Sequence, residues 1–260
     1  MIRTRESKAV PVGVVKKVLK ILEVLHGNPA GLQLKEIAGQ TAINKSTAYR
    51  FLAHLQSEGY LYRDEAGAYV IGPKLARIGS GTNFEESLRK MSRPVLQKLW
   101  TATGETVNLA ILDGQQILYL AVIESSHTFR FASQVGARRP LYCTALGKAM
   151  MSYLLPEEIE HLLPALAYER FTPHTITQPA KLKRELVKTR MRGYAVDDEE
   201  AVLGARCIAA PIFDANARVT GGVSLSGPIT RISQDKVAPF AAILRKAALS
   251  ISRRLGYQKA

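Results

Sequence analysis

The sequence predicts an α+β protein, with a small N-terminal winged helix-turn-helix unit followed by a larger domain built on an antiparallel sheet. Three observations lead to this prediction. Helix-period patterns and a short pair of β-prone runs open the chain, several strand-like runs follow from residue 106, and a long amphipathic segment closes it. Helices placed before, within and after closely spaced strands are typical of α+β domains rather than of βαβ repeats.

Composition limits the class of protein. The chain has 260 residues, of which 47% are hydrophobic and 22% charged, as in globular proteins with a sizeable core. No apolar run approaches the ~20 residues that span a bilayer, and no signal-peptide pattern follows the basic N-terminus. We therefore expect a cytoplasmic protein without membrane contact. Cys143 and Cys207 have no metal-ligand or redox spacing, so we expect no metal ion, no cofactor and no disulfide.

The net charge indicates a polyanionic partner. The chain carries 36 Lys and Arg against 22 Asp and Glu, a formal charge of +14. A positive field concentrates nucleic acid near the surface, so double-stranded DNA is the first partner to consider. The alternative is a basic protein with no such partner. Both parts of the chain are basic, so charge alone does not locate a binding site.

The first predicted helix covers residues 15–25, and a second, shorter helix follows over residues 32–41. A Gly- and Pro-containing segment separates the two helices. The predicted apolar face of the first helix consists of Val15, Val18, Leu19, Leu22 and Leu25.

A third helix is predicted over residues 44–58, with Asn44 as its N-cap and Gly59 just past its end. Its apolar stripe, Ala48, Phe51, Leu52 and Leu55, has the i, i+3, i+4, i+7 spacing of one helical face. Two short β-prone runs, 60–64 and 68–72, then indicate a hairpin around a Gly-containing loop. Three helices and a hairpin are the order of a winged helix-turn-helix.

The polar side of the third helix has the residues expected of a DNA-reading helix. In a helix-turn-helix, the second helix of the pair enters the major groove with its N-terminal residues against base edges. Hydroxyl groups and cations at that end suit phosphates and bases. The predicted contacts are Lys45, Ser46, Thr47, Tyr49 and Arg50, with Arg63 and Tyr69 of the hairpin reaching a neighbouring groove or backbone. The alternative is an ordinary three-helix unit with a solvated polar face.

Pro73 and a Gly/Ser/Thr/Asn cluster mark a domain boundary. We expect a DNA-binding domain over 1–74, a linker helix region over 75–95 and a second domain over 96–260. The predicted strands of the second domain are 106–112, 116–123, 128–133, 205–215 and 218–227. Its predicted helices are 144–155, 156–163, 180–193 and 236–256, the last interrupted near Pro239.

Three segments of the second domain have chemical character. A helix begins near Thr144, a run of four carboxylates begins at Asp197, and Ser224 and Ser226 fall on one face of a strand. Catalysis is poorly supported, because Ser224 lacks a GxSxG elbow and no sequence spacing places a histidine beside it. The alternative to a binding site is that the carboxylates belong to a solvated turn and that the serines only form hydrogen bonds with the backbone.

Taken together, these segments resemble those of the IclR-type bacterial transcriptional regulators. The resemblance covers nearly the whole chain in the family's order, and its motifs are "NKSTAYRFLAHLQSEGYL", "PLYCTALGKA", "TRMRGYAVDDEEAVLGARCIAAPIFD" and "GGVSLSGPITRI". It implies an N-terminal DNA-binding domain, a linker helix and a C-terminal GAF-like domain that binds a small effector. It also implies homodimers, often paired as homotetramers.

The resemblance also implies which residues bind the effector. They are Ala145 and Leu146, through their backbone N–H groups, and Asp197, Cys207, Ser224 and Ser226. Amide and hydroxyl donors suit a carboxylate, and Asp197 suits a hydroxyl or hydrate on the ligand. Some relatives have Gly and Ala where this chain has Ala145 and Leu146, so the pocket volume differs. We expect a small organic acid.

We therefore expect a transcriptional regulator whose operator affinity is modulated by a small organic-acid effector, and not an enzyme. Two other classes remain open. One is a hydrolase-like domain, using Ser224 or Asp197, fused to a DNA-binding domain; it needs a base beside its nucleophile. The other is an architectural DNA-binding protein, which needs no polar pocket in its second domain.

Overall fold

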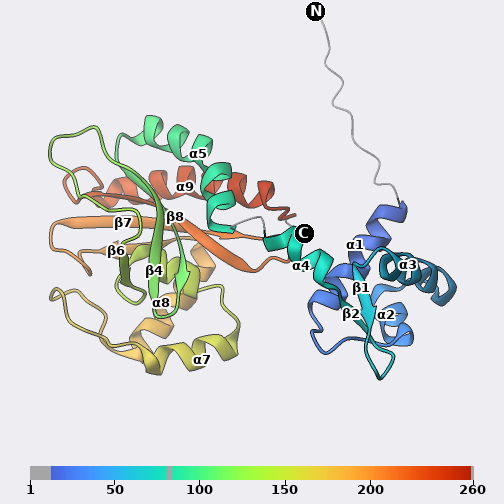
Figure 1. Cartoon of the computed structure of the whole chain (residues 1–260). Coiled ribbons are helices and arrows are strands. Elements are labelled where there is room, and N and C mark those ends of the chain that lie inside the picture. Colours follow the sequence, from blue (N-terminus) through green and yellow to red (C-terminus); the bar gives the residue numbers. More distant parts are fainter. Residues whose placement is uncertain (1–12, 81–83, 259–260) are drawn as a thin grey trace, which may run out of the picture. The chain divides into compact units, whose positions relative to one another are not determined.

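The computed structural model describes residues 13–80 and 84–258. The chain forms two compact units, Met1–Asn83 and Phe84–Ala260. Figure 1 identifies the elements of each unit. Along the described chain no helix is long and apolar enough to cross a membrane.

The N-terminal unit has the predicted order of three helices and a hairpin. Its elements are α1 (Gly13–His26), α2 (Leu34–Thr41), α3 (Lys45–Ser57), β1 (Leu61–Arg63), β2 (Tyr69–Ile71) and α4 (Pro73–Ser80). Asn44 caps α3 as predicted, because its side chain accepts a hydrogen bond from the Ser46 amide at 3.0 Å. At the base of the hairpin, a Cβ at Gly72 would lie 2.7 Å from the Gly59 carbonyl oxygen, so only glycine fits there.

The buried face of α1 differs from the prediction. Val15 and Leu19 are 54% and 52% exposed, whereas Ile21 and Leu25 are buried. Val18 and Leu22 pack partly against the same core. The helix is therefore rotated so that the Val18–Ile21–Leu22–Leu25 stripe meets α2 and β2. Both stripes have helical spacing, and only contact with the neighbouring elements selects between them.

The C-terminal unit is a six-stranded antiparallel sheet with helices on both faces, in strand order β5-β4-β3-β8-β7-β6. Its strands are β3 (Thr106–Asp113), β4 (Gln116–Ile123), β5 (Arg138–Pro140), β6 (Ala195–Asp198), β7 (Ala205–Phe213) and β8 (Val219–Pro228). Its helices are α5 (Phe84–Thr103), α6 (Ala145–Met151), α7 (Pro156–Ala165), α8 (Pro179–Arg192) and α9 (Gln234–Arg254). The predicted α+β class is confirmed.

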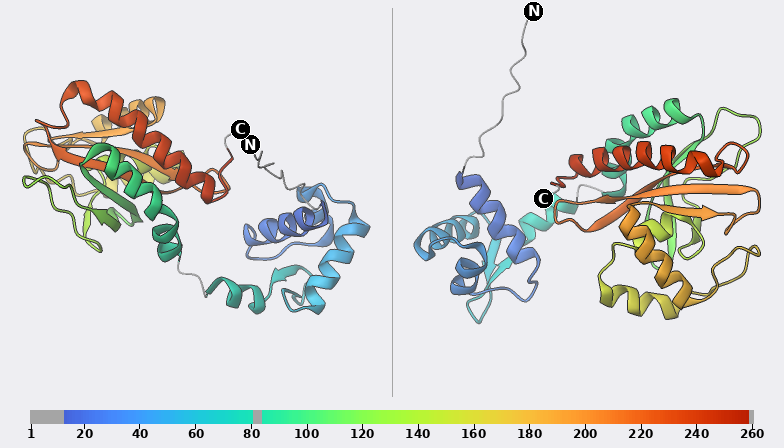
Figure 2. Two further views of the ribbon diagram at one scale, coloured as in Figure 1. Left: turned by 90° about the horizontal axis from the view of Figure 1, so that it is seen from above. Right: turned by 180° about the vertical axis from the view of Figure 1, so that it is seen from behind.

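The sheet separates two hydrophobic cores. Helices α5 and α9 lie side by side on one face (Figures 1 and 2), over a core that includes Leu109 and Val223. Helices α6, α7 and α8 lie on the other face, over a core that includes Ala110 and Ala209. Since side chains alternate along a strand, Ser224, the neighbour of Val223, points toward the α6 face.

Two predictions about the C-terminal unit are wrong. Residues 128–133 are not a strand; they lie in the irregular connection from β4 to β5, where the Thr106 hydroxyl bonds the Phe131 carbonyl at 3.3 Å. The strand beside β4 is instead β5, a three-residue edge strand with two arginines and a proline. Also, α9 is continuous through Pro239, although a proline at this position removes one helical hydrogen bond.

Candidate functional site

The candidate DNA-reading surface is the polar side of α3. Lys45, Ser46, Tyr49 and Arg50 are exposed and Thr47 is half-buried. On the other side of the helix, Ala48, Leu52 and Leu55 are buried in the core of the unit. The packed stripe fixes the orientation of α3, so its cations and hydroxyl groups face outward. The Ser46 hydroxyl also donates to Asn44 Oδ1 at 2.7 Å, which gives it a capping role beside any contact with DNA.

The structure contradicts one predicted DNA contact. Tyr69 is only 2% exposed and belongs to the core of the N-terminal unit. The Arg63 guanidinium covers its ring at 5.0 Å and donates from Nε to the Gly67 carbonyl at 3.0 Å. In the register of the hairpin Arg63 lies opposite Tyr69, whereas Tyr62 pairs with Val70 and is 47% exposed. Tyr62 is therefore the outward-facing tyrosine of the hairpin, and strand alternation was the signal for it.

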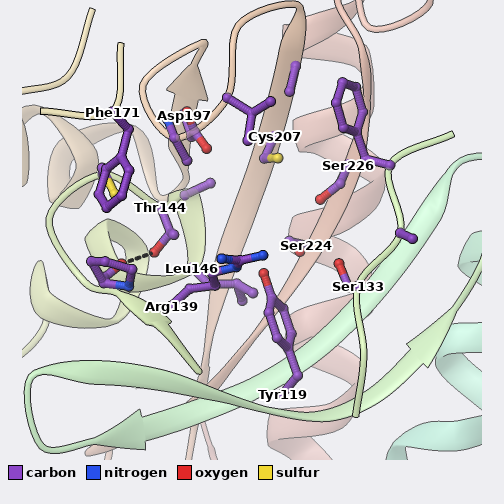
Figure 3. Close-up of a pocket in the computed structure, with 18 residues that line it drawn as sticks. Tyr119, Ser133, Arg139, Thr144, Leu146, Phe171, Asp197, Cys207, Ser224 and Ser226 are labelled. Carbon is purple, nitrogen blue, oxygen red and sulfur yellow. Dashed lines mark hydrogen bonds between the residues drawn. The ribbon is translucent and has the colours of Figure 1, made fainter. Parts of the chain in front are cut away.

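The C-terminal unit encloses a pocket of about 160 Å³ on the α6 face of the sheet (Figure 3). All of the predicted effector residues line it: Ala145, Leu146, Asp197, Cys207, Ser224 and Ser226. They come from α6, β6, β7 and β8, which the fold brings together. A cavity of about this size holds a benzene ring in other proteins, so the pocket suits a single ring or a short chain.

Further lining residues were missed by the sequence reasoning. They are Tyr119 of β4, Phe131 and Ser133 of the following connection, Arg139 of β5 and Phe171. The alternation of β4 was a usable signal for Tyr119. The others lie on segments that had no periodic pattern or were assigned wrongly, and nothing in the sequence distinguished them.

A buried asparagine beneath the pocket orients the two serines. Asn108 of β3 is fully buried, and its Nδ2 donates to the hydroxyl oxygens of Ser224 and Ser226, each at 3.1 Å. Because each hydroxyl oxygen accepts from Asn108, its own hydrogen remains to be donated elsewhere. The Ser224 hydroxyl can therefore donate to a ligand in the pocket, and so can that of Ser226, which also bonds the Cys207 side chain. This also weakens the hydrolase reading, since the partner of Ser224 is an amide and not a base.

Asp197 is the acid of the pocket. It is 3% exposed, and its Oδ1 accepts from the amides of Glu200 at 2.8 Å and Ala201 at 3.3 Å. Burial raises the pKa of Asp197 to about 6, against the opposing effect of the Lys148 charge. The other carboxylates of the run have their own partners: Asp198 pairs with Arg206, Glu199 accepts from the Gly204 amide at 2.8 Å, and Glu200 pairs with Lys148.

A buried ion pair holds this turn against α6. Lys148 of α6 is fully buried and pairs with Glu200, whose pKa burial raises to about 7. From the other side, the hydroxyls of Thr172 and Thr175 donate to the carbonyls of Glu199 and Glu200, at 2.6 and 2.7 Å. Close packing of α6 needs Gly147, where a Cβ would lie 2.2 Å from the Leu141 carbonyl oxygen.

The two cysteines and the tyrosine of the pocket are neutral near pH 7. Burial raises the pKa of both thiols, Cys143 and Cys207, to about 12, and raises that of Tyr119 to about 12. Since the thiolate is the nucleophilic form of cysteine, neither thiol is activated. Among residues 13–80 and 84–258, no cluster of three His, Cys, Asp or Glu side chains suits a metal ion.

A winged helix-turn-helix unit, joined in one chain to a domain with a polar pocket, defines a ligand-responsive transcription regulator. Residues 14–65 match the model of the IclR helix-turn-helix domain, and residues 84–253 match that of the bacterial transcriptional regulator IclR C-terminal domain. The chain belongs to the IclR family. It is a DNA-binding transcriptional regulator with a C-terminal effector-binding domain, and not an enzyme.

Curated relatives and solved structures are similar over nearly the full length. The transcriptional repressor IclR of Escherichia coli is 34% identical over 241 residues, which are 92% of this chain and 88% of the repressor. The regulator BhcR of Paracoccus denitrificans is 37% identical over 237 residues, 91% and 85% of the two chains. The crystal structure of Thermotoga maritima IclR has a TM-score of 0.64 at 35% identity, with 94% and 99% covered.

A ligand complex is also among the similar structures. An IclR homologue from Microbacterium hydrocarbonoxydans, complexed with 4-hydroxybenzoate, has a TM-score of 0.61 at 25% identity. The similarity covers 93% of this chain and 98% of that one.

Proposed function

We propose that a small organic acid, bound in the pocket of the C-terminal unit, modulates the affinity of this regulator for its operator. The observation that carries the proposal is the pair of hydrogen bonds from Asn108 to Ser224 and Ser226, because they leave both hydroxyl hydrogens available for a carboxylate. Ala145, Leu146, Asp197 and Cys207 complete the proposed site. The complex of a relative with 4-hydroxybenzoate, a carboxylate, supports this ligand class.

For DNA, the proposed contacts are Lys45, Ser46, Thr47, Tyr49 and Arg50 of α3, together with Arg63 at the periphery. The exposure of the α3 residues and the buried stripe behind them support this assignment. The positive end of the α3 dipole also favours phosphate. A module with so few contacts needs two half-sites for useful affinity at cellular salt, so we propose that the protein acts as a homodimer or homotetramer.

We propose that residues 1–74 bind DNA, that residues 75–95 transmit the signal and that residues 96–260 bind the effector. The boundary between the two compact units, at Asn83 and Phe84, falls inside the proposed transmitting segment. Effector binding favours one arrangement of the recognition helices, and the ligand shifts that equilibrium by its differential affinity, with couplings of about 1–3 kcal/mol being typical.

The test is footprinting on the DNA immediately upstream of the protein's own gene and its neighbour, at about 150 mM salt, a physiological ionic strength. Arg50→Ala should weaken specific binding about 5- to 150-fold, since a base contact contributes about 1–3 kcal/mol. Arg184→Ala removes the same charge from an exposed position on α8 and serves as the control. Equal binding to operator and random DNA, unchanged by Arg50→Ala, would refute the proposed recognition.

A further inference from the structure

Strand alternation turns one of the two arginines of β5 toward the pocket. In the β4–β5 register, Arg139 lies opposite Ile117 and Arg138 lies opposite Leu118. Directly paired residues share a face of the sheet. Ile117 belongs to the core under α6, whereas Leu118 packs against the core under α5 and α9. Arg139 therefore faces the pocket, and Arg138 faces away from it and pairs with Asp113 at 2.6 Å.

Several hydrogen-bond donors gather around Arg139. Figure 3 shows its guanidinium group within the pocket, beside Tyr119 and Leu146, with Ser133 and Ser224 nearby. Tyr119 and the serines are neutral donors. Of the described residues that line the pocket, Arg139 alone carries a full positive charge. A guanidinium presents two parallel N–H groups that match the two oxygens of a carboxylate.

The negatively charged group of the pocket, Asp197, lies toward the opposite edge of the sheet from Arg139. Asp197 lies on β6, and the strand order places β5 and β6 at opposite edges. Its neighbour across the strand pair is Cys207, and Figure 3 shows both away from Arg139. The pocket therefore presents a cation at one end and a buried carboxylate at the other.

We infer that Arg139 determines effector specificity by pairing with the carboxylate of a small hydroxy acid, whose hydroxyl group donates to Asp197 at the far end. This inference rests on the proposed function and specifies the ligand and its orientation. A cavity of about 160 Å³ limits the ligand to one ring or a short chain. A purely apolar ligand would cover the Arg139 guanidinium without pairing its charge, so the lining favours an acid over an apolar ligand.

The experiment compares acids with their neutral amides by calorimetry on the full-length chain. The probes are 4-hydroxybenzoate and 3-hydroxybutyrate, each against its amide, with benzoate as the acid that lacks a hydroxyl group. Wild type should bind one of the hydroxy acids about tenfold or more tightly than its amide, the size expected of a charged hydrogen bond. Arg139→Leu should abolish this preference, and Arg139→Lys should retain part of it.

The matched control is Arg138→Leu, which removes the same side chain from the next position of β5 and should leave the preference unchanged. Asp197→Asn should keep the preference for acid over amide and reduce that for 4-hydroxybenzoate over benzoate. A preference that persists in Arg139→Leu would overturn the role of Arg139 and leave an organic-acid effector intact. If neither hydroxy acid binds, the ligand assignment fails, whereas DNA recognition is judged separately by the footprint and Arg50→Ala.

Discussion

Lys148 and Glu200 form an ion pair almost completely withdrawn from water, with side-chain exposures of 0% and 9%. The pair joins α6 to the turn that carries Asp197, across 52 positions of the sequence. The second carboxylate oxygen of Glu200, Oε2, is buried without a hydrogen-bond partner in the described structure. A buried charge pair gives little net stability, but removing one partner is costly.

Lys148→Met should destabilise the C-terminal unit by about 3–5 kcal/mol, because it leaves the Glu200 carboxylate buried and unpaired. The measurement is urea unfolding followed by the fluorescence of Trp100, which lies in this unit. The double variant Lys148→Met/Glu200→Leu should recover most of the loss. If the single variant unfolds like wild type, the pair does not hold the turn.

The stability of the C-terminal unit should fall as pH rises from about 4 to about 7. Burial raises the folded-state pKa of Asp197 to about 6 and that of Glu200 to about 7. The folded protein therefore holds these protons more tightly than the unfolded chain, and this stabilisation is lost as pH rises through the folded-state pKa values. The contribution of Asp197 is on the order of 3 kcal/mol. The midpoint temperature of thermal unfolding, measured at several pH values in this range, checks the prediction.

Asp197→Asn should flatten this pH dependence, since it removes one of the two titrating groups. Glu157→Gln, an exposed position at the start of α7, is the control and should retain the wild-type slope. An unchanged slope in Asp197→Asn would show that the pKa of Asp197 is the same in the folded and unfolded protein.

Asn108→Asp should weaken the binding of organic acids at least about tenfold, with little change in the shape of the side chain. An aspartate at this position accepts hydrogen bonds from Ser224 and Ser226, which withdraws their donors from the pocket, and it adds a negative charge near the ligand. Titration calorimetry with 4-hydroxybenzoate measures the change. The control is Asn216→Asp in the exposed turn between β7 and β8. Equal binding by both variants would argue against donor serines.

The two tyrosines of the hairpin should behave oppositely. Tyr69→Ala removes a ring that is 2% exposed and should cost about 3–5 kcal/mol, as truncation of buried aromatic residues does. Tyr62→Ala, at a 47% exposed position, should change stability by less than about 0.5 kcal/mol. Hydrogen exchange of the α3 amides measures the loss of stability in each variant. Faster exchange in Tyr62→Ala than in Tyr69→Ala would reverse the assignment.

Features that depend on local spacing are predictable from the sequence. The apolar stripe and Asn44 cap of α3, the hairpin after it, and the common face of Ser224 and Ser226 all follow from interactions within a few residues. The resemblance to a known family added the predicted effector residues, all of which line one pocket.

Which faces are covered and which distant groups meet depends on tertiary contacts. Tyr69 was expected outside and is buried, because the hairpin packs it onto the helices. Arg139 faces the pocket through its pairing with β4, and Asn108 meets Ser224 across 116 positions of the chain. Helix and strand periodicities arise from neighbouring residues, whereas burial and polar partners arise when elements far apart in sequence pack together. For that reason the sequence predicted most of the elements and their order but not β5, and the fold determined the chemistry of the pocket.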